Sequence, residues 1–250
     1  MMLLFSESGT LMLDDINRKI FSGRRIIEMN SSAVIHPGDV IVLDGVAYTV
    51  MEYNPQFFPL MGERGAQIIS GLDSAYIISI SGIGHGSRIL ESGTGSGALT
   101  INLLRSTENP SGYVGVDHSE KSSMITKKNV KSFTGMDIEV AISEFDQYEY
   151  AGEKLDAIFL DMPEPWRNVT SQRKWLLSGK KVITYLPNYN QVEKTREEYE
   201  KNGFIHLETL EIEGRKLLVR TGATRPKSTG IIHTGFISSY MKVSGSRIKA

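Results

Sequence analysis

Residues 88–100 read Arg-Ile-Leu-Glu-Ser-Gly-Thr-Gly-Ser-Gly-Ala-Leu-Thr, a short apolar run followed by an acid and then by glycines at every second position. Glycine accepts positive φ and leaves no Cβ in the way of a ligand, so Gly93, Gly95 and Gly97 predict a tight turn between a strand and a helix. The N–H groups at such a helix start favour a nucleotide-type cofactor. The spacing also fits the dinucleotide fingerprint, with Asp117 as the acid expected roughly 20 residues later. The loop alone therefore leaves the cofactor open.

The composition is that of an ordinary globular protein. The chain has 250 residues, of which 40% are hydrophobic and 23% charged, enough for a full-sized core. It has no cysteine, which excludes disulfides, thiolate metal sites and cysteine nucleophiles. The five histidines lack the paired spacing of zinc sites, so we expect no structural metal. No run approaches the roughly 18 apolar residues of a membrane span, and the first residues lack the basic start of a signal peptide. We expect a cytoplasmic protein without membrane association.

The net charge of −1 hides a basic C-terminal part. Residues 215–250 contain no Asp or Glu, and their basic residues are Arg215, Lys216, Arg220, Arg225, Lys227, Lys242, Arg247 and Lys249. Two interpretations stay open. The segment could contact a polyanionic partner with one face, or its cations could be the solvated side chains of strands.

The pattern along the chain predicts two domains. In residues 1–60, short β-type runs surround Asp44-Gly45, a strong hairpin signal, so we expect a small, barrel-like β domain. In residues 61–250, strand and helix patterns alternate, which predicts an α/β fold with a mostly parallel sheet. The expected elements lie at 68–80, 88–91, 98–105, 113–116, 120–131, 139–142, 157–160, 172–177, 181–185 and 191–201. The runs at 204–212, 216–220 and 231–240 are expected to finish the sheet with antiparallel strands.

Acids follow four of the expected parallel strands. They are Glu91, Asp117, Asp161 and, between the last two, either Glu144 or Asp146. Ligands of open α/β sheets bind beyond the carboxyl ends of the strands, so these side chains are expected to converge. A pyrophosphate disfavours nearby carboxylates, whereas a cationic sulfonium and an amino group favour them. The acids therefore favour S-adenosylmethionine over a dinucleotide.

The segment Asp-Met-Pro-Glu-Pro-Trp at 161–166 is the second informative stretch. Two prolines stiffen a loop that begins with an acid at a strand end, and Trp166 could stack on a base. The segment resembles the D-P-P-[YW] loop of methyltransferases that act on amino groups or ring nitrogens. The alternative is a proline-rich surface turn with a buried tryptophan.

Together these motifs resemble the tRNA (adenine-N1)-methyltransferase family that modifies the T-loop adenosine. The resemblance rests on residues 89–100 and 158–167, on Ala66-Gln67-Ile68-Ile69, on Tyr185-Leu186-Pro187-Asn188 with Gln191-Val192, and on His233-Thr234-Gly235-Phe236. It implies a class I methyltransferase (Rossmann-like) fold, a homotetramer, S-adenosyl-L-methionine as cofactor and tRNA as substrate, methylated at position 58, with 57 as a second candidate.

The expected site residues follow from the motifs and the resemblance. The expected cofactor-binding residues are Glu91, Gly93, Thr94, Gly95, Ser96, Gly97, Ala98, Leu99, Asp117, Glu144 and Asp161. Asp161 is also the expected catalytic residue, and the expected substrate-binding residues are Trp166, Arg225, Lys227 and His233.

The chain departs from the family pattern in three places. Asp117 stands where the family usually has Glu, His85 where it has Pro, and Ser70-Gly71-Leu72-Asp73 where it has Tyr-Pro-Lys-Asp. The alternatives are a methyltransferase for another RNA base, an NAD-linked oxidoreductase and an RNA-binding module with a vestigial cofactor loop. An oxidoreductase would need a proton-transfer Tyr/Lys pair or His that the sequence does not offer at an obvious place.

Overall fold

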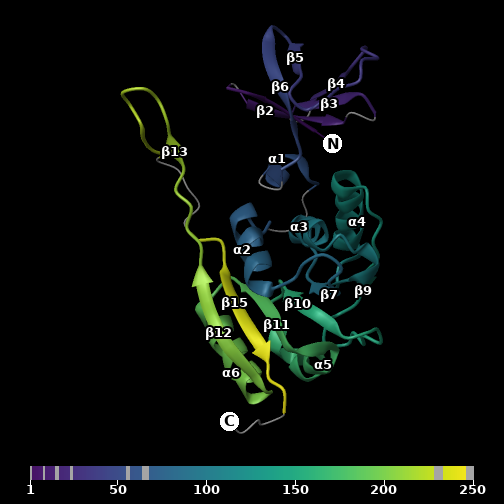
Figure 1. Cartoon of the computed structure of the whole chain (residues 1–250), viewed down its shortest axis with the longest axis vertical. Helices are drawn as coiled ribbons and strands as arrows, with labels where there is room; N and C mark the ends of the chain where they lie inside the picture. The colour runs from purple at the N-terminus through teal and green to yellow at the C-terminus, as the bar shows by residue number, and fades with distance from the viewer. Residues whose placement is uncertain are drawn as a thin grey trace. The chain divides into compact units, whose positions relative to one another are not determined.

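A computed structural model describes residues 2–7, 9–14, 17–22, 25–54, 57–63, 68–227 and 233–245. The chain forms two compact units, Met1–Gly62 and Glu63–Ala250 (Figure 1). The sequence pattern placed the boundary after residue 60. Ala66 and Gln67, two residues of the family resemblance, lie outside the described residues, as do 231–232 of an expected strand. No helix in the described parts of the chain is long and apolar enough to cross a membrane.

The first unit is an antiparallel sheet. Its strands, in the order β4-β3-β2-β1-β6-β5, are β1 (Met2–Ser6), β2 (Gly9–Asp14), β3 (Lys19–Ser22), β4 (Arg25–Glu28), β5 (Val40–Leu43) and β6 (Val46–Glu52). Asp44 and Gly45 connect β5 to β6 with φ of 49° and 79°, as a two-residue hairpin turn requires, so the expected hairpin is confirmed. Leu4, Leu13 and Ile20 are among the side chains that fill its core. A short helix, α1 (Phe58–Met61), ends this unit.

The second unit is built on a seven-stranded sheet in the order β12-β15-β11-β10-β7-β8-β9. The strands are β7 (Ile89–Ser92), β8 (Tyr113–Asp117), β9 (Val140–Ile142), β10 (Leu155–Leu160), β11 (Leu176–Leu186), β12 (Phe204–Glu211) and β15 (Phe236–Lys242). From β9 to β11 neighbouring strands are parallel, and β15 and β12 are antiparallel additions, as expected. The chain order reverses between the adjacent strands β7 and β10, which is the switch point where such sheets bind ligands.

Side chains alternate between the two faces of this sheet. Leu90, Ile158, Val182 and Tyr240 stand in register across four strands and belong to a core that also includes Trp175 and other residues of the α5 and α6 side. One position further along each strand, the side chains face the opposite way, where Phe159 and Ile183 meet Ile77. The helices are α2 (Gly71–Ser81), α3 (Ala98–Thr107), α4 (Glu120–Thr134), α5 (Val169–Trp175) and α6 (Tyr189–Lys201), with short 3-10 turns η2 (Pro110–Gly112) and η3 (Pro165–Asn168). Both faces are therefore covered.

Two sequence expectations about this unit were wrong in detail. The predicted element at 172–177 combines the end of α5 with the first residues of β11, because Leu176 pairs with Leu155 of β10. The predicted strand at 216–220 does not extend the large sheet. Instead β13 (Leu217–Leu218) pairs with β14 (Arg225–Pro226), since a turn at Gly222, with φ of 72°, lets this segment close on itself.

Candidate active site

A cavity of about 280 Å³ opens at the carboxyl ends of the parallel strands. The residues that line it come from the glycine loop, from the residues after β8, β9 and β10, and from the segment before α2: Ile69, Glu91, Ser92, Gly93, Thr94, Gly95, Ser96, Ala98, Leu99, Asp117, His118, Ser122, Ser143, Glu144, Phe145, Asp161, Met162 and Pro163. The four acids expected at strand ends thus share one cavity, with Glu144 rather than Asp146 on its wall.

Gly93 lies directly against the backbone of Asp161, where the loop after β10 begins. It has φ of +85°, and a Cβ at this position would lie 1.9 Å from the carbonyl oxygen of Asp161. The Asp161 N–H in turn donates to the carbonyl of Ser92 over 2.9 Å. The glycine turn and the loop that begins at Asp161 are therefore pressed backbone to backbone, and only glycine fits between them.

Gly97 has a different task from the other loop residues. It is the N-cap of α3 with φ of +82°, and its Cβ position would lie 3.3 Å from the Cα of Thr126 on α4. It does not line the cavity, although it was expected to bind the cofactor. Its absence of a side chain allows α3 and α4 to approach closely, and this packing sets the start of α3 beside the cavity.

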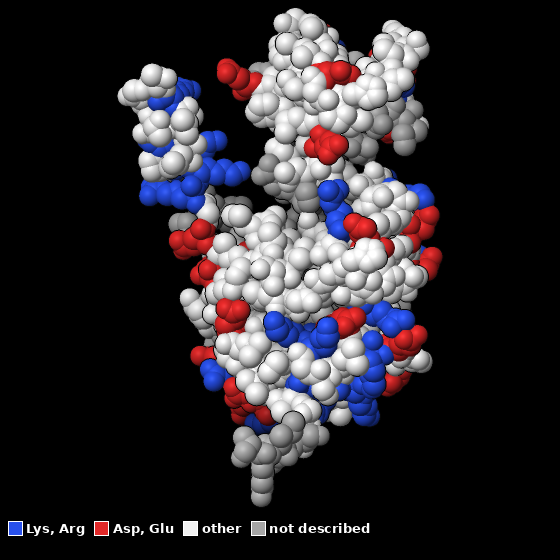
Figure 2. Space-filling model, in the orientation of Figure 1, with Lys and Arg blue, Asp and Glu red and all other residues white. Residues whose placement is uncertain are grey.

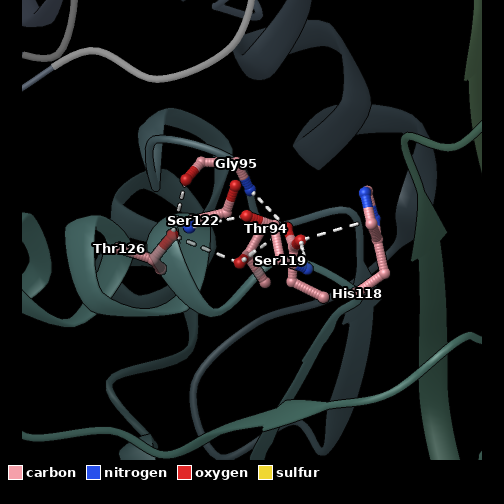
Figure 3. A network of polar contacts seen from close by, with 7 residues as sticks. Thr94, Gly95, His118, Ser119, Ser122 and Thr126 are labelled. Atoms are coloured by element: carbon pink, nitrogen blue, oxygen red, sulfur yellow. Dashed lines mark hydrogen bonds and ion pairs between the residues drawn. The ribbon is translucent and has the colours of Figure 1, made fainter.

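Asp117 is held by a network of polar contacts at the end of β8 (Figure 3). Its Oδ2 accepts from the Gly95 N–H over 3.0 Å and its Oδ1 from the Ser119 N–H over 2.9 Å. The Thr94 hydroxyl donates to Oδ2 over 3.4 Å. Oδ2 thus accepts two hydrogen bonds, whereas Oδ1 accepts one and has a second lone pair, so this oriented and 4% exposed carboxylate can still accept from a ligand.

Thr126 and Ser119 fix the surroundings of this carboxylate. The Thr126 hydroxyl lies 3.2 Å from the Thr94 hydroxyl and 3.1 Å from the Gly95 carbonyl. The Ser119 hydroxyl accepts from the Ser122 N–H over 3.2 Å and so caps α4. Figure 3 shows these side chains converging from the glycine loop and from the first turns of α4.

Glu91 is buried at the end of β7. Its Oε2 accepts from the Tyr113 hydroxyl over 2.6 Å and from the Thr100 hydroxyl over 2.7 Å. Burial raises the pKa of Glu91 to about 8, with smaller contributions from Asp161 and Asp117, although the two hydroxyl donors oppose the shift.

Asp161 directly follows β10 on the cavity wall. Among the described residues, no side chain or backbone group donates to its carboxylate. Burial raises the pKa of Asp161 to about 7, and the negative charge of Asp117 adds to the shift. Asp161 also borders a second, very small cavity of about 10 Å³, together with Tyr185. The Tyr185 hydroxyl donates to buried Asp73 over 3.4 Å.

The loop after Asp161 is tied to α5 and α6. The Gln191 amide donates to the carbonyl of Pro163 over 2.8 Å, and the Gln172 amide donates to that of Pro165 over 2.7 Å. Trp166 packs against the core on this side of the sheet, and the Lys194 ammonium lies 4.6 Å from the centroid of its ring. Trp166 does not line the cavity, so its expected stacking on a base stays a prediction.

His233 joins three segments. Its Nδ1 contacts the Glu211 carboxylate, and its Nε2 lies 2.9 Å from the carbonyl oxygen of Pro187. Both partners accept hydrogen bonds, so a ring that donates to both carries a positive charge. The hydrogen bond to Glu211 raises the pKa of His233, and the Pro187 carbonyl adds to the shift. This residue, expected to bind substrate, does not line the cavity either.

The hairpin formed by β13 and β14 carries Arg225, and Lys227 follows β14 directly. Both residues were expected to contact tRNA. Figure 2 shows basic side chains gathered on it. The segment 215–227 has five basic residues, and none of them has a carboxylate of the described residues within salt-bridge distance. They are Arg215, Lys216, Arg220, Arg225 and Lys227. Arg247 and Lys249 lie outside the described residues.

Sequence reasoning missed several residues of the cavity wall. Ser92, His118, Ser143 and Met162 each stand directly beside a strand end or an expected acid, and this adjacency was a signal that could have found them. Ile69 belongs to a motif of the family resemblance, but no strand end or acid adjoins it, and it reaches the cavity through the fold from a position before α2. No group of three or more His, Asp or Glu side chains in the described residues could hold a metal ion.

The donor set fits a cationic nucleoside. One carboxylate is oriented by backbone N–H groups and can still accept from a ligand hydroxyl, the other acids can supply negative charge, and the glycine turn leaves room at the backbone. A pyrophosphate beside the same acids would be repelled.

Comparison with known proteins agrees with this geometry. A tRNA (adenine(57)-N(1)/adenine(58)-N(1))-methyltransferase TrmI of Methanocaldococcus jannaschii is 31% identical over 193 residues, which cover 66% of this chain and 68% of that relative. A tRNA (adenine(58)-N(1))-methyltransferase catalytic subunit of Dictyostelium discoideum is 28% identical over 184 residues, which cover 70% of this chain but only 57% of that relative. The crystal structure of tRNA (m1A58) methyltransferase TrmI from Aquifex aeolicus has 26% sequence identity and a TM-score of 0.81, and covers 97% of this chain and 96% of that one.

These findings confirm the class I methyltransferase fold that was expected from the motifs. The family described as the tRNA methyltransferase complex GCD14 subunit matches residues 45–236, which include the whole cavity wall. Because this match takes in most of the chain, the protein belongs to the tRNA methyltransferase complex GCD14 subunit family.

Proposed function

We propose that this protein transfers a methyl group from S-adenosyl-L-methionine to N1 of the T-loop adenosine of tRNA, at position 58, with position 57 as a second candidate. The observation that carries the proposal is the meeting of Glu91, Asp117 and Asp161 with the glycine turn in one cavity at the switch point. Membership of a tRNA methyltransferase family supports the choice of substrate.

Asp117 and the glycine turn would hold the cofactor. The Asp117 carboxylate, fixed by two backbone N–H groups, suits the two hydroxyls of a ribose. Glu91 and Asp161 supply the negative charge that a sulfonium and an amino group require. When bound, the cofactor would supply an electrophilic methyl group on a cationic sulfur. A bound cation would also favour the ionised forms of these acids and so lower their raised pKa values.

Asp161 would activate the adenine. N1 has an in-plane lone pair and needs no deprotonation, but the base gains positive charge as its bond to the methyl forms and the carbon–sulfur bond breaks. A carboxylate that accepts from the exocyclic N6 amine opposes this charge, and the stabilisation is larger in the transition state than in the ground state. The free acceptor capacity of Asp161 supports this role. The folded T-loop hides N1, so the base must leave its stack before transfer.

The β13–β14 hairpin would contact tRNA phosphates through Arg225 and Lys227. Its cations are exposed, and none has a carboxylate of the described residues within salt-bridge distance, which suits a phosphate-binding surface. We extend the proposal to a homotetramer in the cytoplasm. The exposed apolar side chains Leu217 and Val219, at 55% and 76% exposure, support burial of this segment in an assembly. Sedimentation equilibrium tests the tetramer, and a monomer at micromolar concentration would refute it.

The test of the activity is nucleoside analysis by mass spectrometry. Unmodified tRNA is incubated with the protein and S-adenosylmethionine, and 1-methyladenosine is the expected product. Position is read by repeating the assay with tRNA whose adenosine 58 or 57 is replaced. A product such as N6-methyladenosine, 5-methylcytidine or a methylated guanosine would reject the proposed chemistry. Calorimetric titration with S-adenosylmethionine and with NAD separates the methyltransferase from the oxidoreductase alternative. A methyltransferase should bind S-adenosylmethionine and not NAD, whereas an NAD-linked oxidoreductase should bind NAD.

A further inference from the structure

A second group of cations lies at the amino end of the large sheet, opposite to the cavity. Its members come from the start of β10, the last turn of α5 and the end of β15, and we call Lys154, Arg173, Lys174 and Lys242 the α5 basic cluster. In Figure 2, blue side chains gather over the part of the larger unit that Figure 1 labels α5. The six residues of β10 separate this cluster from Asp161 by roughly 20 Å, at about 3.3 Å per residue.

Backbone carbonyls, and not carboxylates, hold these cations in place. The Lys154 ammonium donates to the Lys174 carbonyl, and the Lys242 ammonium to the Leu176 carbonyl over 2.5 Å. The Arg173 guanidinium donates to the Gly203 carbonyl over 2.7 Å and packs against that glycine. The side chain of Lys174 is exposed and has no hydrogen bond among the described residues. Three of the four charges are thus positioned by the fold.

Outside residues 215–227, most other described cations of the larger unit are paired with an acid. The described pairs include Lys127–Glu139, Lys128–Glu63, Lys131–Asp137, Lys180–Asp156, Arg196–Glu200 and Lys201–Glu197. The two acids next to the α5 basic cluster in sequence are also occupied, since Glu153 pairs with Arg88 at 2.7 Å and Asp156 pairs with Lys180 at 3.0 Å. No member of the cluster has a carboxylate within 4.0 Å in the described chain.

The cations repel one another, and the helix end does not balance them. Burial lowers the pKa of Lys242, and the charges of Lys154 and Arg173 lower it further. The carbonyl end of a helix offers about half a negative charge to four positive ones. Held together without counter-charge, such a group is suited to bind anions. Because its members are spread over three elements, it suits a chain of phosphates better than a single small anion.

We infer that the α5 basic cluster binds backbone phosphates of the RNA substrate, at a site separate from the catalytic cavity. The inference rests on the proposed function for the identity of the RNA. Roughly 20 Å of duplex carries about a dozen phosphates, so an RNA that extends past the cavity can reach the far end of the sheet. Such contacts add affinity without reading sequence.

The test removes two charges and keeps the fold. In Lys154→Gln/Lys174→Gln, the amide at 154 can still donate to a carbonyl, and position 174 is exposed. The matched control is Lys127→Gln/Lys131→Gln on α4, whose cations are already paired with Glu139 and Asp137. The dissociation constant of fluorescent, unmodified tRNA is measured from about 50 to 200 mM salt, and thermal melting checks that both variants are folded.

The inference predicts that the slope of log K against log salt becomes shallower by about 1.4 to 1.8 units in the cluster variant, for two lost phosphate contacts, and unchanged in the control. Methylation of an isolated T-arm hairpin, too short to reach the cluster, should match that of the wild type. A slope equal to that of the control would refute the inference. The cations would then serve only to hydrogen-bond backbone carbonyls near the end of α5. If the wild type formed no 1-methyladenosine but the slopes still differed, the proposed function would fail and the second site would stand.

Discussion

Replacing Gly93 by alanine should disable the site through a displacement that the structure sizes. A Cβ at Gly93 would lie 1.9 Å from the Asp161 carbonyl oxygen, whereas ordinary contacts begin at 3.4 Å. The backbone at residue 93 and the backbone at Asp161 must therefore separate by about 1.5 Å, because no flexible side chain lies between them to give way. The glycine turn also cannot retreat freely, because the Gly93 N–H donates to the carbonyl of Val116 over 3.0 Å.

The displacement moves the proposed catalytic carboxylate. A misplacement of about 1 Å can cost on the order of 10² in rate, so we expect kcat for methylation of tRNA to fall by roughly 10² or more. The left-handed backbone adds a cost of about 1–2 kcal/mol, which should lower the melting temperature. Gly135→Ala is the matched control, because Gly135 also has a positive φ, of +74°, but nothing lies within 4 Å of its Cβ position. It bears the backbone cost without the clash.

The two variants are compared in turnover, in cofactor affinity by calorimetry and in thermal melting. The Gly93 variant should lose much more activity than the Gly135 variant for a similar loss of melting temperature. If the two turned over tRNA at similar rates, the backbone contact between Gly93 and Asp161 would have no part in positioning the site, and the reasoning from it would be wrong.

Five further outcomes are expected. Asp117→Ala should weaken S-adenosylmethionine binding at least roughly tenfold in calorimetry, because each lost hydrogen bond to a charged group is worth about 1.5–3 kcal/mol; unchanged affinity would reject the ribose contact. Asp161→Asn should lower kcat by roughly 10²–10³ with cofactor binding nearly intact, and near-normal turnover would count against its role. Cofactor affinity should rise as pH increases through the pKa values of about 7 for Asp161 and about 8 for Glu91, since only the ionised acids attract a cation. The free energy of unfolding of the ligand-free protein should fall from about pH 4 to about pH 8, because over this range the folded state keeps protons that the unfolded chain has released near 3.8 and 4.5; flat affinity and stability profiles would contradict both. Replacing Arg225 and Lys227 by alanine should make the salt slope of tRNA binding shallower by up to about two units, and an unchanged slope would identify them as solvated side chains.

The parts of the site that could be predicted are those set by local sequence. The turn at Gly93 and Gly95 follows from residues adjacent in the chain, and the expected strand at 88–91 lies at Ile89–Ser92. Each acid could be placed because parallel strands bring their carboxyl ends to one edge. The choice between Glu144 and Asp146 was open, because a short β9 gives little register information. In the structure Glu144 lines the cavity, whereas Asp146 does not and lies 3.8 Å from Arg167.

The parts that could not be predicted depend on partners distant in sequence. Trp166 follows two prolines, a pattern that fits both a tryptophan that stacks on a base and one that packs against the core. Its surroundings are decided by Lys194 on α6 and by the core beneath it. The segment at 216–220 has the apolar pattern of a sheet strand, yet the turn at Gly222 pairs it with residues only a few positions away. A periodic pattern predicts a strand but does not name its neighbour.

Three of the four acids of the cavity, Glu91, Asp117 and Asp161, differ in what holds them. Backbone N–H groups donate to Asp117, so its orientation is set before any ligand arrives. Glu91 is held by two hydroxyls in a buried position, where a neutral acid costs less than a charged one. No described group donates to the Asp161 carboxylate, so its acceptor capacity is available to a ligand. Under the proposed function, a residue whose backbone meets the glycine turn and whose carboxylate is open to a ligand suits the reacting base, whereas the other two acids suit the cofactor.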